Sequence, residues 1–386
     1  MSRNIPLCVP SLKGNELKYV KDCIETEWIS SAGKYVDKFE SIVAKYTRSK
    51  HAIACVNGTS ALQVSLRLSG VEPDHEVIVP TLTFIAPVNA IAYNYAKPIF
   101  MDSDKYYNID VTKTINFIKN ETIYKNGESY NKLTGKIISA IIPVHVWGNA
   151  CRLEELVTTC KERNIAIIED ASESLGTFYK EGKYAGQHTG TIGQIGCISF
   201  NGNKVITTGG GGMILTDDQE LALKAKYLTT QAKDDPIQYK HNEIGYNFRL
   251  TNVQAAIGVA QMEQLDKILK KKKKIHNFYR NEISRVNGLK LANTPNYSQN
   301  NYWLNILQID DLVFSKTNQD LIKNFNLNKI QTRPVWHLNH KQKPYKHCQN
   351  YMIEKAERLH SSSLCLPSSI SLKKKDIDKI INLLDV

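Results

Sequence analysis

The chain has 386 residues, of which 42% are hydrophobic and 23% are charged, and it carries a formal net charge of +12. This composition is that of a globular protein with a substantial core, and it excludes a disordered or collagen-like chain. The longest apolar run, residues 137–147, contains Pro143 and His145 and is too short to span a membrane. Residues 1–14 lack the apolar region of a secretory signal. We therefore expect a cytoplasmic protein without membrane insertion.

The excess of 50 Lys and Arg over 38 Asp and Glu suits an anionic partner, which could be a nucleic acid, a lipid or a small substrate. Much of this excess lies in residues 267–274 (KILKKKKK), inside a helical pattern, which favours a solvated helix face. No nucleic-acid-binding signature accompanies the charge, so we expect no nucleic acid. The 8 cysteines form no C-x-x-C pair, which predicts free thiols and no metal site.

Apolar runs rich in β-formers alternate with amphipathic stretches through the first two thirds of the chain. This alternation predicts a mainly parallel sheet with helices on both faces, whose ligand sites lie beyond the carboxyl ends of the strands. The predicted strands are 52–56, 76–80, 97–101, 136–144, 165–169, 196–200 and 211–215, and helices are predicted at 59–68 and 153–163.

The pattern changes after Gly245. Residues 252–282 predict one long helix that leads into a second unit. Its apolar stripe comprises Ala255, Ala256, Val259, Met262 and Leu265. We therefore predict a large domain over residues 1–250, and a linking helix with a smaller α/β domain over residues 251–386.

The strongest local signal is ISFNGNKVITTGGGGMIL, residues 198–215, in which Lys204 stands on a turn between a strand and four glycines. A lysine whose pKa is lowered by its surroundings can form a Schiff base with a carbonyl group. A lone loop lysine is more often a solvated surface charge. The neighbouring motifs have to decide between these interpretations.

Two carboxylates follow a predicted strand in IAIIEDASESLG, residues 165–176. A carboxylate at a strand end, such as Asp170, can pair with the protonated pyridine nitrogen of pyridoxal phosphate (PLP). The alternative is a helix N-cap formed by Asp170 and Ser172 with Glu173.

Two further motifs are weaker alone. CVNGTSAL, residues 55–62, places a tight turn before a helix N-terminus, where a phosphate can bind, although a simple capped helix has the same pattern. In PTLTFIAPVNAI, residues 80–91, Phe84 follows a strand end and could stack on a planar ring. Its alternative is a core aromatic residue.

Together, in this order and spacing, the four motifs resemble those of the DegT/DnrJ/StrS family of PLP-dependent sugar aminotransferases. The resemblance spans the chain, from residues 15–40 through GYNFRLTNVQAAIGVAQ (245–261) to IQTRPVWH (330–337). It implies the type I, aspartate aminotransferase-like fold. It also implies that Lys204 bonds to the cofactor aldehyde, at a position where the dehydratases of the family carry histidine. Asp170 would then pair with the pyridine nitrogen.

The resemblance implies roles for the other motif residues. Glu173 would lie near the phenolic oxygen of PLP, and Phe84 would stack on its ring. The residues implied for the phosphate are Gly58, Thr59, Ser60 and Ser199 of one subunit, and Asn247 of the neighbouring subunit. A homodimer with shared active sites is therefore expected.

A narrower resemblance rests on WISSAGK (28–34), NGNK-x-ITTGGGGM (201–213) and GYNFRL (245–250). These strings are similar to those of 4-aminotransferases acting on UDP-linked 2-acetamido-4-keto-6-deoxy sugars in legionaminic acid and bacillosamine pathways. The expected reaction moves the amino group of L-glutamate to the C4 ketone for surface glycan biosynthesis, with Lys204 moving the proton. Alternatives are a GDP-4-keto-6-deoxymannose 4-aminotransferase that makes perosamine, a non-catalytic regulator with this fold, and a basic nucleic-acid binder.

Contacts to the substrate are expected near the sugar-nucleotide entrance, in GYNFRL and in TRPVWH. His145, in PVHVWG, either faces the cofactor or is a structural histidine. The residues expected to contact the substrate are Trp28, Ser30, Ser31, His145, Arg249, Arg333, Trp336 and His337.

Overall fold

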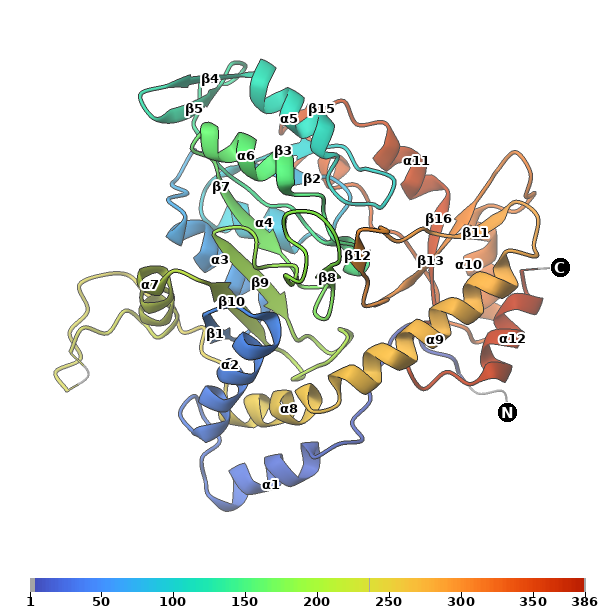
Figure 1. The fold of residues 1–386 in the computed structure, drawn as a ribbon, viewed down its shortest axis with the longest axis horizontal. Coiled ribbons are helices and arrows are strands. Elements are labelled where there is room, and N and C mark those ends of the chain that lie inside the picture. The colour runs from blue at the N-terminus through green and yellow to red at the C-terminus, as the bar shows by residue number, and fades with distance from the viewer. Residues whose placement is uncertain (1–3, 236, 385–386) are drawn as a thin grey trace.

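The structure is a computed structural model that describes residues 4–235 and 237–384. An eight-stranded sheet forms its centre, with the strand order β1-β10-β9-β7-β6-β2-β3-β15 (Figure 1). Neighbouring strands are parallel, except that β10 is antiparallel to both β1 and β9. The strands are β1 (His51–Cys55), β2 (Glu76–Pro80), β3 (Lys97–Met101), β6 (Ile138–Ile141), β7 (Ala166–Asp170), β9 (Ile195–Ser199), β10 (Gly212–Thr216) and β15 (Asn350–Tyr351). The predicted mainly parallel sheet is confirmed.

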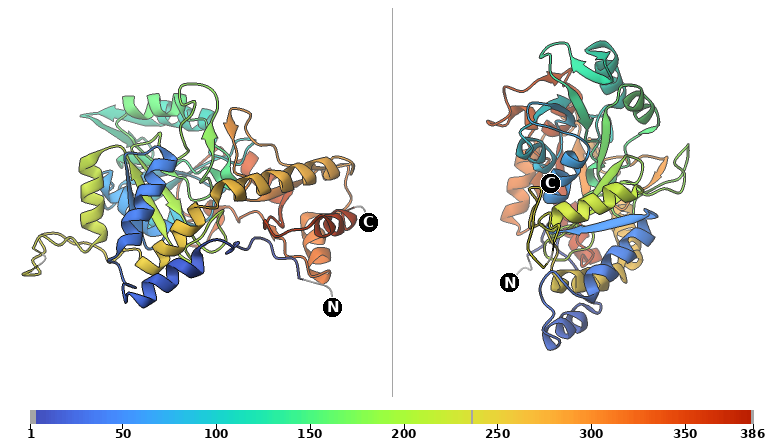
Figure 2. Two further views of the ribbon diagram at one scale, coloured as in Figure 1. Left: turned by 60° about the horizontal axis from the view of Figure 1, so that its bottom comes forward. Right: turned by 90° about the vertical axis from the view of Figure 1, so that its left-hand side faces the viewer.

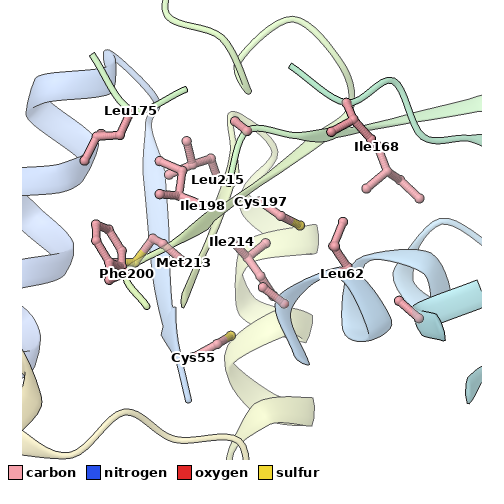
Figure 3. Close-up of a cluster of buried hydrophobic side chains, with 14 of the residues drawn as sticks. Cys55, Leu62, Ile168, Leu175, Cys197, Ile198, Phe200, Met213, Ile214 and Leu215 are labelled. Atoms are coloured by element: carbon pink, nitrogen blue, oxygen red, sulfur yellow. The ribbon is translucent and has the colours of Figure 1, made fainter. Parts of the chain in front are cut away.

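The sheet is buried on both faces, which explains the continuous apolar runs of its strands. Successive residues of β2 belong to different clusters: Val77 and Val79 pack on one face and Ile78 on the other. Figure 3 shows the first cluster where Leu62 meets residues of β9 and β10, such as Cys197 and Ile214. Helices on this face include α3 (Gly58–Leu68), α4 (Ala86–Tyr93) and α7 (Gln219–Thr229), and the other face carries α5 (Val111–Asn120) and α6 (Glu154–Glu162).

A second, antiparallel sheet has the strand order β11-β13-β16-β14 and its own apolar core. Its strands are β11 (Leu289–Leu291), β13 (Asn305–Ile309), β14 (Arg333–Pro334) and β16 (Ser363–Leu366). Helices α10 (Asn318–Leu327) and α12 (Lys374–Asn382) pack in this core, whereas α11 (Lys355–Ser361) buries Ala356 and Leu359 in the first cluster of the large sheet. The remaining elements are α1 (Glu16–Glu25), α2 (Lys34–Thr47), β4 (Thr122–Lys125), β5 (Glu128–Asn131), β8 (Phe178–Tyr179), β12 (Ser298–Gln299) and two short 3-10 helices, Val146–Gly148 and Asn339–Lys341.

Segments cross the predicted division at residue 250 in both directions. Ile5 is 3% exposed and lies in the core of the smaller sheet, where it exchanges backbone hydrogen bonds with Lys329 and Gln331. Strand β15 runs the other way and pairs with β3 at the edge of the large sheet. Helix α12, near the end of the described chain, also packs in the core of the smaller sheet and lies beside it in Figure 2. The division into a unit of residues 1–250 and a unit of residues 251–386 therefore stays a prediction, and it describes only where most residues of each unit lie.

The long helix predicted over residues 252–282 is wrong in one respect, because it consists of two helices. They are α8 (Asn252–Met262) and α9 (Leu265–Ile283). At the break, the N–H of Gln264 donates to the carbonyl of Gln261, three residues back, and the Glu263 carboxylate is held by Asn15 and Tyr19. The predicted stripe is buried through the break.

The prediction of a fully solvated lysine block in residues 267–274 is wrong at Lys272. This side chain is 3% exposed, whereas the other lysines of the block are exposed. All 8 cysteines are free thiols, and six of them are buried. Among the described residues, no helix is long and apolar enough to cross a membrane.

Packing at Gly196 provides a test of the fold. A Cβ at this position of β9 would lie 1.9 Å from the carbonyl oxygen of Gly190. We expect Gly196→Ala to lower the free energy of unfolding in urea by about 3 kcal/mol, because an overpacked core must distort. Gly210→Ala is the control, since the nearest atom there is 3.6 Å away. Equal stability of the two variants would contradict the described packing of β9.

Candidate active site

The site lies at one edge of the large sheet, where the carboxyl ends of parallel strands meet. Asp170 ends β7 and Ser199 ends β9, while β1 leads through a short turn into α3. Because β1 and β9 are both antiparallel to β10, they run in the same direction, and their carboxyl ends share this edge. Strand β2 runs parallel to β7 through β6, so the carboxyl ends that lead to all four sequence motifs lie at this edge.

Lys204 lies on the loop after β9, and its side chain is 14% exposed. Its Nζ is 3.8 Å from Oε1 of Glu173 and 4.5 Å from the ring centroid of Trp303. The loop is closed by hydrogen bonds from Phe200 and Thr208. This enclosure does not match the alternative of a solvated surface lysine.

Glu173 is the carboxylate beside Lys204, and it is 4% exposed. Its Oε2 accepts a hydrogen bond of 2.8 Å from the backbone N–H of Trp147, whose φ of 53° is in the left-handed region. Burial raises the pKa of Glu173 to about 7, although Lys204 and the Trp147 N–H favour the ionised form. Glu173 can therefore hold a proton near neutral pH.

Asp170 is also buried, with 4% of its surface exposed. Its Oδ1 accepts from the N–H of Ser172 at 3.0 Å, and its backbone bonds to Pro143 and His145. Turns and not a helix follow it, so the N-cap alternative is wrong. A buried carboxylate in this position can pair with a cationic ring nitrogen.

The N-terminus of α3 forms an anion cradle beside these groups. Asn57 caps the helix, because its Oδ1 accepts from the N–H of Ser60 at 2.8 Å, so the capped-helix interpretation is also true. The N–H groups of Gly58 and Thr59 belong to the first turn, where the helix supplies no acceptor. A Cβ on Gly58 would lie 2.9 Å from Cβ of Ser199 and 3.2 Å from Oγ of Ser172, so two hydroxyls border the helix end.

This donor set fits PLP. The helix end with its hydroxyl groups suits the phosphate, Asp170 suits the pyridine nitrogen, and the enclosed Lys204 suits the aldehyde. Among the described residues, no group of three His, Cys, Asp or Glu side chains could hold a metal ion.

Comparisons with known proteins agree with this chemistry. The model of the DegT/DnrJ/EryC1/StrS aminotransferase family matches residues 10–385. The chain belongs to this family. The GDP-perosamine synthase of Caulobacter vibrioides is 36% identical over 383 residues, which cover 99% of this chain and 97% of that protein. The GDP-perosamine synthase of Escherichia coli O157:H7 is 37% identical and covers 97% of this chain and 95% of its own length.

Solved structures of the family share the fold. A DegT DnrJ EryC1 StrS aminotransferase from Brucella abortus has a TM-score of 0.86 at 26% identity, over 96% of this chain and 94% of its own. A GDP-4-keto-6-deoxymannose-3-dehydratase with a trapped PLP-glutamate geminal diamine has a TM-score of 0.86 at 21% identity, over 99% of this chain and 100% of its own. The type I fold, the PLP cofactor and the aminotransferase class are confirmed. Both relatives are named as GDP-perosamine synthases, the activity given above as the alternative. Their names do not match the expected UDP-sugar specificity.

Phe84 is 52% exposed, so the alternative of a core aromatic residue is wrong. Its ring meets the edge of Trp336 at 6.4 Å, and Trp336 stacks on Trp147 at 5.1 Å with an interplanar angle of 27°. Two residues expected in this family site, Phe84 and Trp336, are therefore brought together. Trp147, which connects them to Glu173, was missed, although it lies two positions after His145.

The environment of His145 favours the structural alternative. The ring is completely buried, its Nε2 is 2.8 Å from Oε2 of Glu169, and its Nδ1 accepts from the N–H of Cys151 at 3.0 Å. Although burial opposes ionisation, His145 and backbone N–H groups hold the pKa of Glu169 below its ordinary value. Both ring nitrogens of His145 are therefore occupied within the chain.

The other expected substrate residues make no hydrogen bond, ion pair or ring contact with Lys204 within the described chain. Trp28 is 59% exposed, and its carbonyl accepts from the Asn252 side chain. The Arg249 Nε donates to Oδ1 of Asn247 at 3.1 Å, on the exposed segment after α7. No hydrogen bond, ion pair or ring contact within the described chain links the following residues to Lys204, Asp170 or Glu173: Trp28, Ser30, Ser31, Asn247, Arg249, Arg333 and His337.

The raised pKa of Glu173 predicts a pH-dependent stability of the cofactor-free protein. The folded state binds this proton more tightly than the unfolded state, so the stabilisation is complete below about pH 4.5 and is lost as the pH rises to about 7. Glu173→Gln removes this loss. We expect the variant to exceed the parent in free energy of unfolding by about 1–3 kcal/mol at pH 8, and by much less at pH 5.

Urea unfolding at both pH values measures this difference. Glu155→Gln, on the exposed face of α6, is the control and should change stability by less than about 0.5 kcal/mol at either pH. A difference between Glu173→Gln and the parent that is the same at pH 5 and pH 8 would show that the carboxyl group titrates normally.

Proposed function

We propose that this family member transfers the amino group of L-glutamate to the C4 ketone of GDP-4-keto-6-deoxymannose, and so makes GDP-perosamine for surface glycan biosynthesis. The observation that carries the transamination is the enclosed Lys204, which stands beside the buried Glu173, at the sheet edge that also carries the buried Asp170 and an anion cradle. The full-length similarity to two GDP-perosamine synthases, at 36% and 37% identity, supports the GDP-sugar.

The residues of the chain have separate tasks in this proposal. PLP, when bound, supplies an electron sink for the carbon that loses its proton. The Lys204 Nζ takes the α-proton of L-glutamate, and it later delivers a proton to C4 of the sugar. Asp170 keeps the proton of the pyridine nitrogen in place, and protonated Glu173 donates to the phenolic oxygen. The N–H groups of Gly58 and Thr59 and the hydroxyls of Ser60 and Ser199 bind the phosphate.

We infer that the active form is a homodimer in which Asn247 completes the site of the other subunit. Asn247 is exposed, lies far along the chain from the cradle and forms an isolated β-bridge with Thr230. The segment between these two residues, which follows α7, projects from the body (Figure 1). That segment carries exposed apolar side chains: Ile237 at 87%, Tyr239 at 70% and Ile244 at 80%. A projecting apolar segment is typical of a surface that a partner covers.

A substrate panel tests the reaction. We expect the PLP-loaded protein to change its absorbance with L-glutamate, and then to aminate GDP-4-keto-6-deoxymannose at least about tenfold faster than UDP- or dTDP-linked ketosugars. Lys204→Ala should lose about a thousandfold or more in rate, because the proton-transferring amine is gone. A preference for a UDP-sugar would restore the UDP-sugar expectation, whereas a protein without a PLP absorbance band would overturn the aminotransferase proposal.

Mixing two inactive variants tests the shared site. Lys204→Ala and Asn247→Asp subunits are unfolded together, refolded and assayed. Half of randomly formed dimers are mixed, and each contains one intact site of two, so the mixture should regain about a quarter of the parental activity. Each variant refolded alone is the control. No regain in the mixture would show that Asn247 acts within its own subunit.

A further inference from the structure

Trp303 contacts both the backbone and the side chain of the Lys204 loop. This residue precedes β13 and is 3% exposed. Its ring centroid is 4.5 Å from the Lys204 Nζ, and its indole N–H donates at 2.7 Å to the carbonyl of Asn203, the residue before Lys204. The motifs of the large sheet contain no hint of this residue, because it comes from the C-terminal third of the chain.

Trp303 is itself held on two sides. Its N–H donates to Oδ1 of Asn301, and the Asn301 side chain donates to the carbonyls of Glu173 and Leu175. Its carbonyl accepts from Nζ of Lys272 at 2.9 Å, and the same ammonium donates to the carbonyl of Ser368 at 2.9 Å. The orientation of the indole is therefore fixed by the Glu173 segment and by α9.

Lys272 is an unusual anchor because its buried ammonium faces two carbonyls and, within the described chain, no carboxylate. Burying a cation without an anion is costly, and burial lowers its pKa. Lys272 lies on the buried face of α9 with Ile268 and Ile275, whereas the five other lysines of residues 267–274 are exposed. What Lys272 contributes at this position is a pair of hydrogen bonds, which connect α9 to the backbone at Trp303 and Ser368.

We propose that Trp303 is a positioning residue for Lys204, and that the buried Lys272 fixes Trp303 from the smaller unit. The proposal rests on the proposed function, in which Lys204 is the reacting amine. A ring face attracts an ammonium group. The Trp303 ring therefore holds the Lys204 side chain in place until its amine reacts with PLP or with the substrate. The titratable groups on this side are Glu173, at 3.8 Å from the Lys204 Nζ, and Asp170, which acts on Glu173. They also include Cys8, whose thiol donates to the Asn203 carbonyl at 3.3 Å, and Lys272, which donates to the Trp303 carbonyl.

The first test measures the reactivity of Lys204 in the cofactor-free protein. Competitive acetylation at pH 8, read by mass spectrometry, gives the rate at this lysine. We expect Trp303→Leu, which removes the ring beside the enclosed amine, to let Lys204 react about three- to tenfold faster. Trp303→Phe keeps a ring and should stay within about twofold of the parent. The exposed Lys271 is the internal reference.

The second test follows the half-reaction of the PLP-loaded protein with L-glutamate. Trp303→Leu should lower the limiting rate about tenfold or more, while the half-saturating glutamate concentration changes less than about twofold, because orientation and not binding is lost. Lys272→Met leaves the ring but frees the Trp303 carbonyl, and it should act in the same direction. Phe325→Leu, in the core of the smaller unit, controls for a general loss of packing.

The outcomes separate the two proposals. If the parent shows no PLP band, the proposed function fails, and the acetylation rate still decides the role of Trp303. If the parent is active but Trp303→Leu leaves both the acetylation rate and the limiting rate unchanged, the positioning role is overturned. If only Lys272→Met is without effect, the anchoring from α9 is overturned. Equal losses in Trp303→Leu and Phe325→Leu would indicate only general destabilisation, which also contradicts the proposal.

Discussion

The carboxylate of Glu169 is completely buried beneath the site and receives four donors. Three are the backbone N–H groups of Gly190, Ile192 and Gly193, which lead into β9, and the fourth is His145, which follows β6. A buried carboxylate needs this many partners to stay ionised. Since Asp170 is the next residue, the same cluster fixes the carboxylate proposed to face the cofactor. The loops after β6 and before β9 are thereby tied to the end of β7.

Around this anchor, the site draws on parts of the chain that are far apart in sequence. The cradle comes from α3, the two carboxylates from the end of β7, and the lysine from the loop after β9. The smaller unit then adds Trp303 over the lysine and Trp336 beside Phe84. The Lys204 amine is therefore enclosed by segments from distant parts of the chain, so its surroundings depend on how these segments pack. Such an arrangement suits chemistry in which water must be kept from a reactive amine.

Much of the large sheet could be predicted, because its strands are continuous apolar runs and its site motifs stand at strand ends. Lys204 and Asp170 are recognisable for that reason. The break between α8 and α9 could not be predicted, because the apolar stripe continues on both sides of Glu263 and Gln264. Only the contacts of Glu263 with Asn15 and Tyr19 distinguish this position. The burial of Lys272 and the place of Trp303 depend on tertiary packing between units. The role of His145 was left open, because a histidine at a strand end has the same sequence pattern whether it faces a ligand or a buried glutamate.

Strand β15 has a consequence for how the protein is made. The outer edge of β3 is complete only when Asn350 and Tyr351 pair with it, about 250 residues after the end of β3. At a synthesis rate of about 5–20 residues per second, this edge stays open for roughly 12–50 s on the ribosome. The backbone of Ile5 likewise has no partners until Lys329 and Gln331, with which it forms hydrogen bonds, have been synthesised. An open edge is a template for pairing with other chains, so the nascent protein is exposed to aggregation for most of its synthesis.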